Sequence, residues 1–188
     1  MNPIIQKDYL EQFEQRVMNE LLKLCTSTGM LSGTLLSSDD IDDQWQKLAP
    51  EYMVDAVPQV KDYPTVSVAW ACYLGMGVAW GWDTDWTLCK EDSYQTYYGT
   101  LGFDDMDEHI VRDMLGLPLD GYEAIAIEKL IRRCGETAIT LIRREKIEPQ
   151  SAMAFHVFAR VCRVMYRIGA AIELKRLGYK FEKMNPDC

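Results

Sequence analysis

A run of 20 residues without one charged side chain, from Tyr63 to Trp82, restricts the possible folds more than any other feature of the chain. The run is long enough to cross a lipid bilayer as a helix. However, it contains Thr65, Ser67 and three glycines, it lacks a basic flank, and Asp83 and Asp85 follow it. We therefore interpret it as the buried central helix of a globular protein.

Small side chains recur every four residues within this run, at Ser67, Ala71, Gly75 and Ala79. Residues four apart lie on one face of a helix, so the four form a ridge of small side chains. Such a ridge lets the backbone of another helix approach closely. We therefore expect a neighbouring helix to pack tightly against it.

Helical periodicity predicts most of the remaining chain. A first helix of about 22 residues begins at Asn2 and Pro3 and stops before Gly29. Ser38 caps a second helix, which Pro50 is expected to kink or split. The segments that follow are a short helix or an ordered loop over Trp86–Tyr98, a short helix capped by Asp104 or Asp105 and ending near Gly116, and long helices over about Leu119–Lys146 and Gln150–Leu177.

No segment shows the strict alternation of apolar and polar residues that indicates a strand, and no repeat or linker-like tract divides the chain. A length of 188 residues suits one domain. We predict a single all-α domain over residues 1–188. It is a helical bundle of about six helices with a buried central helix, and the segments 63–82 and 150–177 form its centre.

The chain begins without the basic segment and apolar run of a secretory signal, which predicts a cytoplasmic protein. The six cysteines support this interpretation, because they are scattered. None forms a C-x-x-C motif, and none has a partner at zinc-ligand spacing. We expect reduced thiols that pack as small apolar groups.

Charge divides the chain unevenly. Residues 1–128 contain 23 acidic and 7 basic side chains, whereas residues 129–188 contain 6 acidic and 13 basic ones. The net charge of −9 argues against nucleic-acid binding. Three arrangements account for the division: the acidic part packs around the basic part, two chains pair acid to base in a homo-oligomer, or the basic part docks an anionic partner.

Two carboxylates and two indoles gather where the uncharged run ends, at Trp82, Asp83, Asp85 and Trp86. Such a group could hold a cation, or a sugar stacked on a ring. It does not fit a calcium loop, because the twelfth position from Asp83 is Tyr94 rather than glutamate. The structural alternative is that Asp83 or Asp85 caps the next helix while the tryptophans fill the core.

Asp105, His109 and Asp113 follow one another at intervals of four residues, which places them on one face of an α-helix. A histidine between carboxylates could bind a metal ion or act as a general base. The di-iron and H-E-x-x-H patterns are both missing from the sequence. An acidic helix start with an exposed histidine explains the same residues, and it also explains the aspartate cluster at residues 39–43.

The last helix carries His156, Arg160, Arg163 and Arg167 within a band about 60° wide, and apolar side chains occupy most of its remaining circumference. We call the three arginines the arginine row. Arginines on a mostly buried helix need partners. Either they pair with carboxylates of the first 128 residues, or they form a pocket that binds a small anion, with His156 as a proton carrier.

Glycine-rich phosphate loops, G-x-S-x-G and dinucleotide-binding signatures are missing, so the sequence predicts neither a cofactor nor a catalytic group that meets its spacing. The leading hypothesis is a non-enzymatic helical interaction protein that forms a homodimer. The first alternative is a binder or enzyme for a small anionic ligand at the arginine row and nearby aromatic residues. The second alternative is a metal-binding protein at Asp105, His109 and Asp113.

Overall fold

A computed structural model describes residues 2–180 and confirms the all-α fold. Within that range no strand forms, and only Gly99 and Gly102 make an isolated bridge. The helices are α1 (Pro3–Ser27), α2 (Asp39–Ala56), α3 (Pro64–Cys89), the short α4 (Met106–Glu108), α5 (Tyr122–Arg144) and α6 (Ala152–Arg176). Short turns are the 3₁₀ segments η1 (Val57–Gln59), η2 (Tyr94–Tyr97) and η3 (Phe103–Asp105) and the π-helical η4 (His109–Met114).

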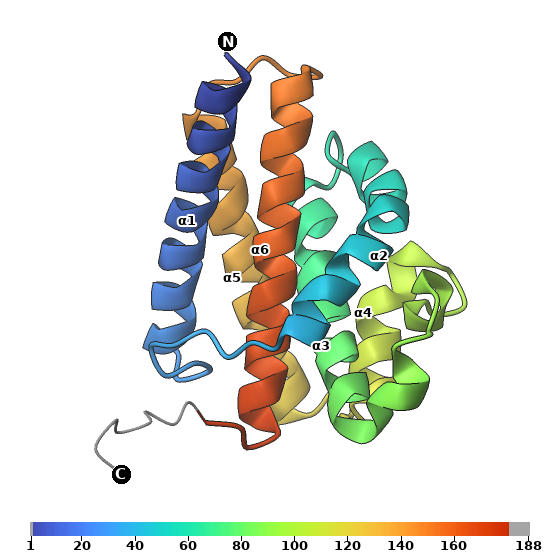
Figure 1. The fold of residues 1–188 in the computed structure, drawn as a ribbon. Coiled ribbons are helices and arrows are strands. Elements are labelled where there is room, and N and C mark those ends of the chain that lie inside the picture. Colours follow the sequence, from blue (N-terminus) through green and yellow to red (C-terminus); the bar gives the residue numbers. More distant parts are fainter. Residues whose placement is uncertain (1, 181–188) are drawn as a thin grey trace.

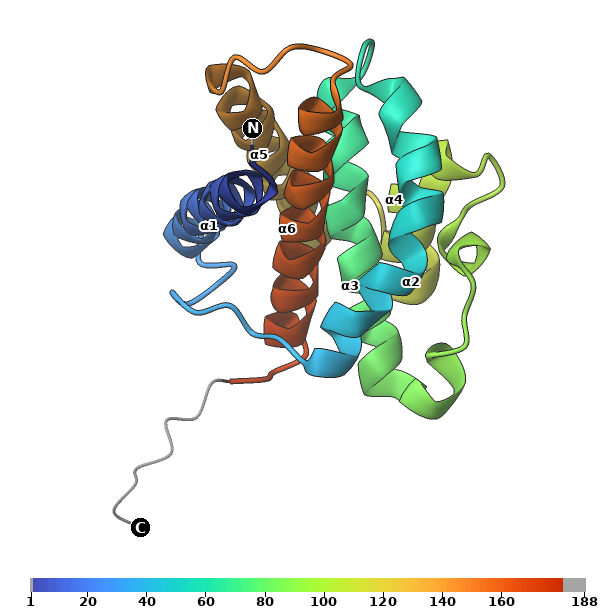
Figure 2. The same cartoon turned by 45° about the horizontal axis from the view of Figure 1, so that its top comes forward.

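Helices α3 and α6 lie side by side through the middle of the bundle (Figure 1). Helices α1 and α5 cover one side of this pair, and α2, α4 and the turns near them cover the other, as the rotated view in Figure 2 also shows. Half of the residues of α3 and more than half of those of α6 are buried. The predicted buried central helix and its partner are therefore confirmed.

The ridge of small side chains is the closest contact between the two central helices. A Cβ atom added at Gly75 would lie 2.0 Å from the carbonyl oxygen of Tyr166. On the other helix, a Cβ atom at Gly169 would lie 1.8 Å from the carbonyl oxygen of Cys72. Because these neighbours are backbone atoms, both positions require glycine. The expected close approach is confirmed.

Helix α3 extends beyond the uncharged run to Cys89, with a local interruption at Asp85, where φ is −163° and ψ is 89°. The ambiguous segment 86–98 is thus divided between the end of α3 and η2. None of the helices in residues 2–180 is long and apolar enough to cross a membrane.

Two helices have a side-chain cap at the N-terminus, one expected at Asn2 and one not expected at Ser151. The side chain of Asn2 accepts a hydrogen bond from Ile4 N at 3.0 Å, and that of Ser151 accepts one from Ala154 N at 3.0 Å. Ser38 precedes α2 without a side-chain cap. Gly29 and Gly178 follow α1 and α6 with φ angles of 79° and 98°, which glycine adopts readily.

Three boundaries differ from those expected. Pro50 does not split α2, which runs on to Ala56, because Pro50 is exposed and water can satisfy the carbonyl group left without a partner. Helix α5 begins at Tyr122 rather than Leu119. The short helix before Gly116 is a mixture of 3₁₀, α and π turns.

Two buried tyrosines attach α2 to the central pair. Tyr52 of α2 donates a hydrogen bond to the carbonyl oxygen of Ser67 at 2.7 Å, and Tyr166 of α6 donates one to that of Ile41 at 2.6 Å. Trp45 lies between them, with its ring centroid 5.0 Å from that of Tyr166. These contacts set the position of α2 beside α6, and hence the surface between them.

Candidate functional site

The arginine row lies on α6 between α1 and α2, and each arginine meets a carboxylate from the acidic part of the chain. Arg160 Nη1 lies 2.5 Å from Glu14 Oε2, and Arg163 Nε lies 3.5 Å from the second oxygen of the same carboxylate. Arg167 Nε lies 3.5 Å from Asp42 Oδ1. Each arginine of the row therefore has a carboxylate of the first 128 residues nearby, at distances from 2.5 to 3.5 Å.

Only one of these three contacts is a short hydrogen bond. At 3.5 Å, the contacts of Arg163 and Arg167 are too long for well-formed hydrogen bonds. Within residues 2–180, Arg167 Nε is buried without a hydrogen-bond partner. Burial raises the pKa of the Asp42 carboxyl, and the positive charges of Arg167 and Arg163 oppose this shift without cancelling it.

A cavity of about 280 Å³ opens between α1 and α6 at the arginine row. All three arginines line it. The side from α1 carries Glu11, Glu14, Gln15 and Met18. The cavity therefore has basic groups on one wall and acidic or polar groups on the other.

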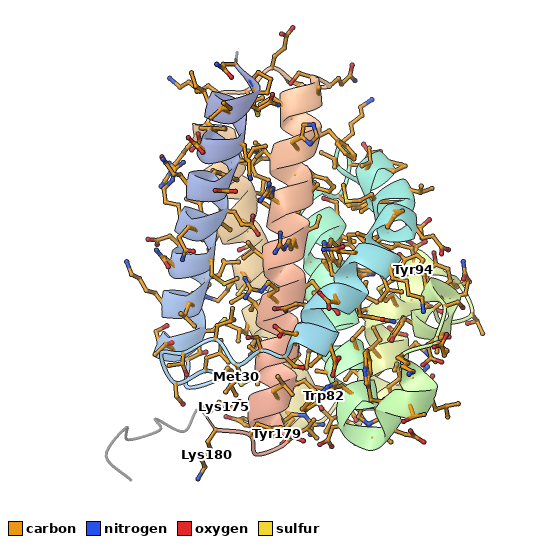
Figure 3. The ribbon with its side chains drawn as sticks, in the orientation of Figure 1. Met30, Trp82, Tyr94, Lys175, Tyr179 and Lys180 are labelled. Carbon is orange, nitrogen blue, oxygen red and sulfur yellow. The ribbon has the colours of Figure 1, made fainter. Side chains whose placement is uncertain are left out.

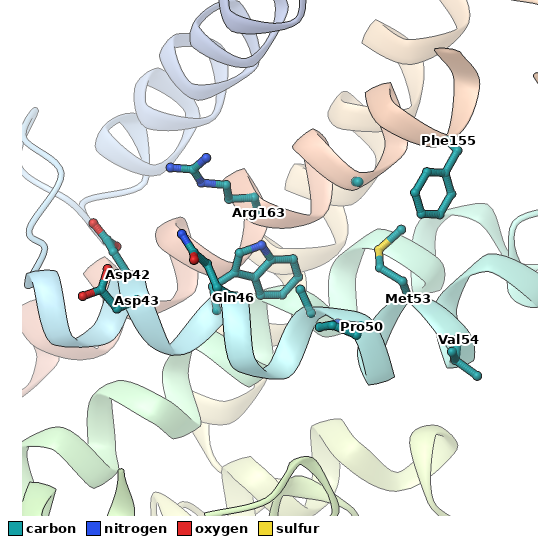
Figure 4. A pocket seen from close by; sticks show the side chains of 11 residues that line it. Asp42, Asp43, Gln46, Pro50, Met53, Val54, Phe155 and Arg163 are labelled. Atoms are coloured by element: carbon teal, nitrogen blue, oxygen red, sulfur yellow. The ribbon is translucent and has the colours of Figure 1, made fainter. Parts of the chain in front are cut away.

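A larger groove of about 730 Å³ lies on the other side of α6, between α6 and α2. Most of its wall is apolar, from Trp45, Ala49, Pro50, Met53, Val54, Phe155 and Ala159, and the polar residues that line it are Asp42, Asp43, Gln46 and Arg163. Figure 4 shows Asp42, Asp43 and Arg163 toward one end of this groove, and Met53, Val54 and Phe155 toward the other. We call it the α2–α6 groove.

His156 does not join the arginines in either cavity. It is exposed near the start of α6, and its ring centroid lies 5.9 Å from that of Phe155. It lies one helical turn before Arg160, and although its neighbour Phe155 lines the α2–α6 groove, His156 lines neither cavity.

The group at the end of the uncharged run is held by contacts within the chain. Asp83 accepts a hydrogen bond from the Tyr179 hydroxyl at 2.7 Å, and Asp85 accepts one from Leu88 N at 3.3 Å. Figure 3 shows Trp82 beside Tyr179, with the two ring centroids 5.4 Å apart. Trp86 is half-buried against the core. These contacts match the structural alternative, in which an aspartate caps the next turn.

The structure brings His109 and Asp113 together but not Asp105. His109 Nδ1 lies 3.0 Å from Asp113, and its Nε2 lies 3.0 Å from the carbonyl oxygen of Thr96. Asp105 instead accepts hydrogen bonds from the Thr100 hydroxyl and Leu101 N. The expected common face is absent because Asp105 ends the 3₁₀ turn η3 with φ −98° and ψ 1°, outside the α-helix that the spacing assumed, and its carboxylate turns back toward residues 100 and 101. No three potential metal-ligating side chains gather within residues 2–180.

Sequence reasoning offered a pocket at the arginine row as one alternative, but it missed the α2–α6 groove and the role of Glu14. The signal for the ion pairs was present, since acidic side chains on α1 and α2 face a basic helix, but periodicity does not tell which helices are neighbours. The α2–α6 groove has a weaker signal, the apolar pair Met53 and Val54 at successive positions of a helix. No known family model, curated protein or solved structure matches this chain in the comparisons.

Proposed function

We propose that the protein is a non-enzymatic interaction protein that self-associates as a homodimer through the α2–α6 groove. The observation that supports this proposal is the apolar wall of the groove. Val54 and Phe155 on that wall are 73% and 48% exposed, although large apolar side chains gain free energy when they leave water.

A second copy of the chain is the occupant that suits the groove best. In a two-fold dimer each patch meets itself, so a self-complementary surface is required. The α2–α6 groove carries Asp42, Asp43 and Arg163 beside its apolar wall, so each copy brings both signs of charge. Opposed copies can therefore pair acid to base while their apolar walls meet.

A stable interface buries about 800 Å² on each partner, more than a groove of this size offers. Three further apolar side chains follow α2 along the chain, at Val57, Val60 and Tyr63, and all are exposed. We expect them to extend the interface beyond the groove.

Light scattering coupled to size-exclusion chromatography tests the proposal. We expect a mass of twice 21.6 kDa at both low and physiological salt. Val54→Lys and Phe155→Asp should each produce the monomer. Lysine suits the C-terminal end of α2 and aspartate the N-terminal end of α6, so both variants should remain folded.

Leu101→Asp is the matched control, because Leu101 is 72% exposed and lies outside the groove. This variant should remain dimeric. A wild-type protein that is monomeric at micromolar concentration would refute the proposal, and a dimer that survives both groove substitutions would place the interface elsewhere.

A further inference from the structure

The cavity between α1 and α6 has more positive groups than partners for them. Arg160, Arg163 and Arg167 all line it, while within residues 2–180 their ion pairs involve two carboxylates, Glu14 and Asp42. Arg160 takes the short contact to Glu14. The guanidinium groups of Arg163 and Arg167 are left with contacts of 3.5 Å.

A guanidinium group carries five N–H donors in a planar fork, and two forks without close acceptors are suited to grip an oxyanion. Arg167 Nε needs an acceptor, because among residues 2–180 it is buried and has no hydrogen-bond partner. A buried donor without an acceptor is costly, so an acceptor supplied by a ligand is stabilising. We infer that this cavity is a binding site for the carboxylate or phosphate group of a small metabolite.

The dimensions and the opposite wall limit what can enter. A volume of about 280 Å³ lies at the small end of ligand-binding cavities. Glu11 and Glu14 line the α1 side, so a polyanion such as a nucleotide triphosphate would be repelled. An ammonium group on the ligand would instead find Glu11, which is exposed and whose ion pair with Lys7 is long, at 3.8 Å. A small aminocarboxylate can therefore satisfy both walls.

Thermal unfolding of the full chain tests the inference with four probes at equal ionic strength: inorganic phosphate, acetate, glycine and ATP. At saturation, we expect phosphate or a carboxylate to raise the melting temperature by about 3 °C over sodium chloride, and ATP to give no specific rise. A larger rise in melting temperature with glycine than with acetate would indicate that the ammonium group of the ligand contacts the α1 wall. A larger effect of phosphate than of either assigns the site to a phosphate group. If none of phosphate, acetate and glycine raises the melting temperature, the inference is refuted.

Two substitutions locate the site. Arg163→Gln and Arg167→Gln should each abolish the ligand-induced rise. Arg163 is half exposed, so its variant is expected to fold even if the Arg167 variant does not. Arg132→Gln is the matched control, because it removes the same charge from an exposed arginine on α5. Equal loss of the rise in the control, or its persistence in Arg163→Gln, would overturn the assignment.

The inference does not depend on the proposed dimer, although Arg163 lines both the cavity and the α2–α6 groove. Repeating the thermal unfolding measurements with Phe155→Asp separates ligand binding from dimerisation, because Phe155 lines the groove but not the cavity. We expect this variant to bind as the wild type does. If it loses ligand binding together with dimerisation, the site is not complete within one chain and the inference as stated fails.

Discussion

At the scale of single residues, two arginines that share one carboxylate should contribute unequally to stability. Arg160 makes the 2.5 Å contact with Glu14, whose side chain is only 14% exposed. Arg160→Met would leave that carboxylate with a distant partner, at a cost of about 2–3 kcal/mol. Arg163→Met leaves Glu14 paired to Arg160 and should cost less than about 1 kcal/mol. Urea unfolding at neutral pH measures both.

Equal and large losses in the two variants would mean that Glu14, Arg160 and Arg163 act as one buried network. In that case the exposed position of Arg163 would be a poor guide to its contribution, and the cavity would be a structural ion cluster.

Asp107, at the start of α4, should make stability depend on pH. Burial raises the pKa of its carboxyl to about 6, from the model-peptide value of 3.8. The folded state therefore binds the proton more tightly than the unfolded state, and stability falls as pH rises from about 4 to 6. Asp107→Asn removes this penalty and should stabilise the protein by about 1–2 kcal/mol at pH 7, since the carboxyl is only partly buried and water screens its charge. Below pH 4 the variant should show no gain in stability.

Unfolding curves at pH 3.5 and pH 7 give the measurement for Asp107→Asn. Leu101, which is exposed and carries no charge, provides the control, and Leu101→Asn should show the same stability difference from wild type at both values. A gain for Asp107→Asn that is independent of pH would contradict the assignment to burial of its charge.

At the scale of helices, the contact between α3 and α6 has almost no room to change. Gly75→Leu would push a side chain into the backbone of α6 at Tyr166, and should cost about 3 kcal/mol or more. The melting temperature should then fall by roughly 6 °C or more, or the variant should fail to fold. Ala152→Leu, at the exposed start of α6, should leave it unchanged. A wild-type melting temperature in Gly75→Leu would refute the close packing of these helices.

Helices α1 and α5 meet through two thiols that sequence spacing did not connect. The sulfur atoms of Cys25 and Cys134 lie 3.7 Å apart, and both residues are buried. Diamide, a two-electron oxidant, should convert the pair to a disulfide during local opening of the end of α1, with loss of two hydrogens from the protein and their transfer to diamide. Peptide mass spectrometry identifies the link, and Cys25→Ser removes it. Complete alkylation of both thiols after oxidation would contradict the prediction.

Helix positions could be predicted because their signals are local. Apolar residues spaced three and four apart, Asn2 before Pro3, and glycines at positions of positive φ act through their nearest neighbours in the chain. The π-helical turn at His109 and the extension of α3 past Asp85 could not be predicted from the sequence, because contacts between elements stabilise them. The arginine row was predictable as one face of a helix, whereas Glu14 and the two cavities depend on which helices are neighbours.

At the scale of the whole molecule, part of the uneven division of charge is compensated by ion pairs within one chain. Ion pairs connect the basic part to the acidic part at Arg160 with Glu14, Arg167 with Asp42 and Arg176 with Glu123. The interpretation that the acidic part packs around the basic part is supported by these contacts. The remaining exposed basic groups include Arg133, Arg143 and Arg144 on α5.

This arrangement predicts that the protein does not bind duplex DNA, even at low salt. Nucleic-acid binding depends on cations that release counterions from phosphates, and three arginines of α6 already face carboxylates. The net charge of −9 adds repulsion from the rest of the surface. Fluorescence anisotropy of a labelled duplex in 20–50 mM salt should therefore remain flat as protein is added, a range in which nonspecific DNA-binding proteins bind strongly. Binding that disappears in the double variant Arg143→Gln and Arg144→Gln would show instead that the exposed end of α5 acts as a basic patch independent of the acidic part of the chain.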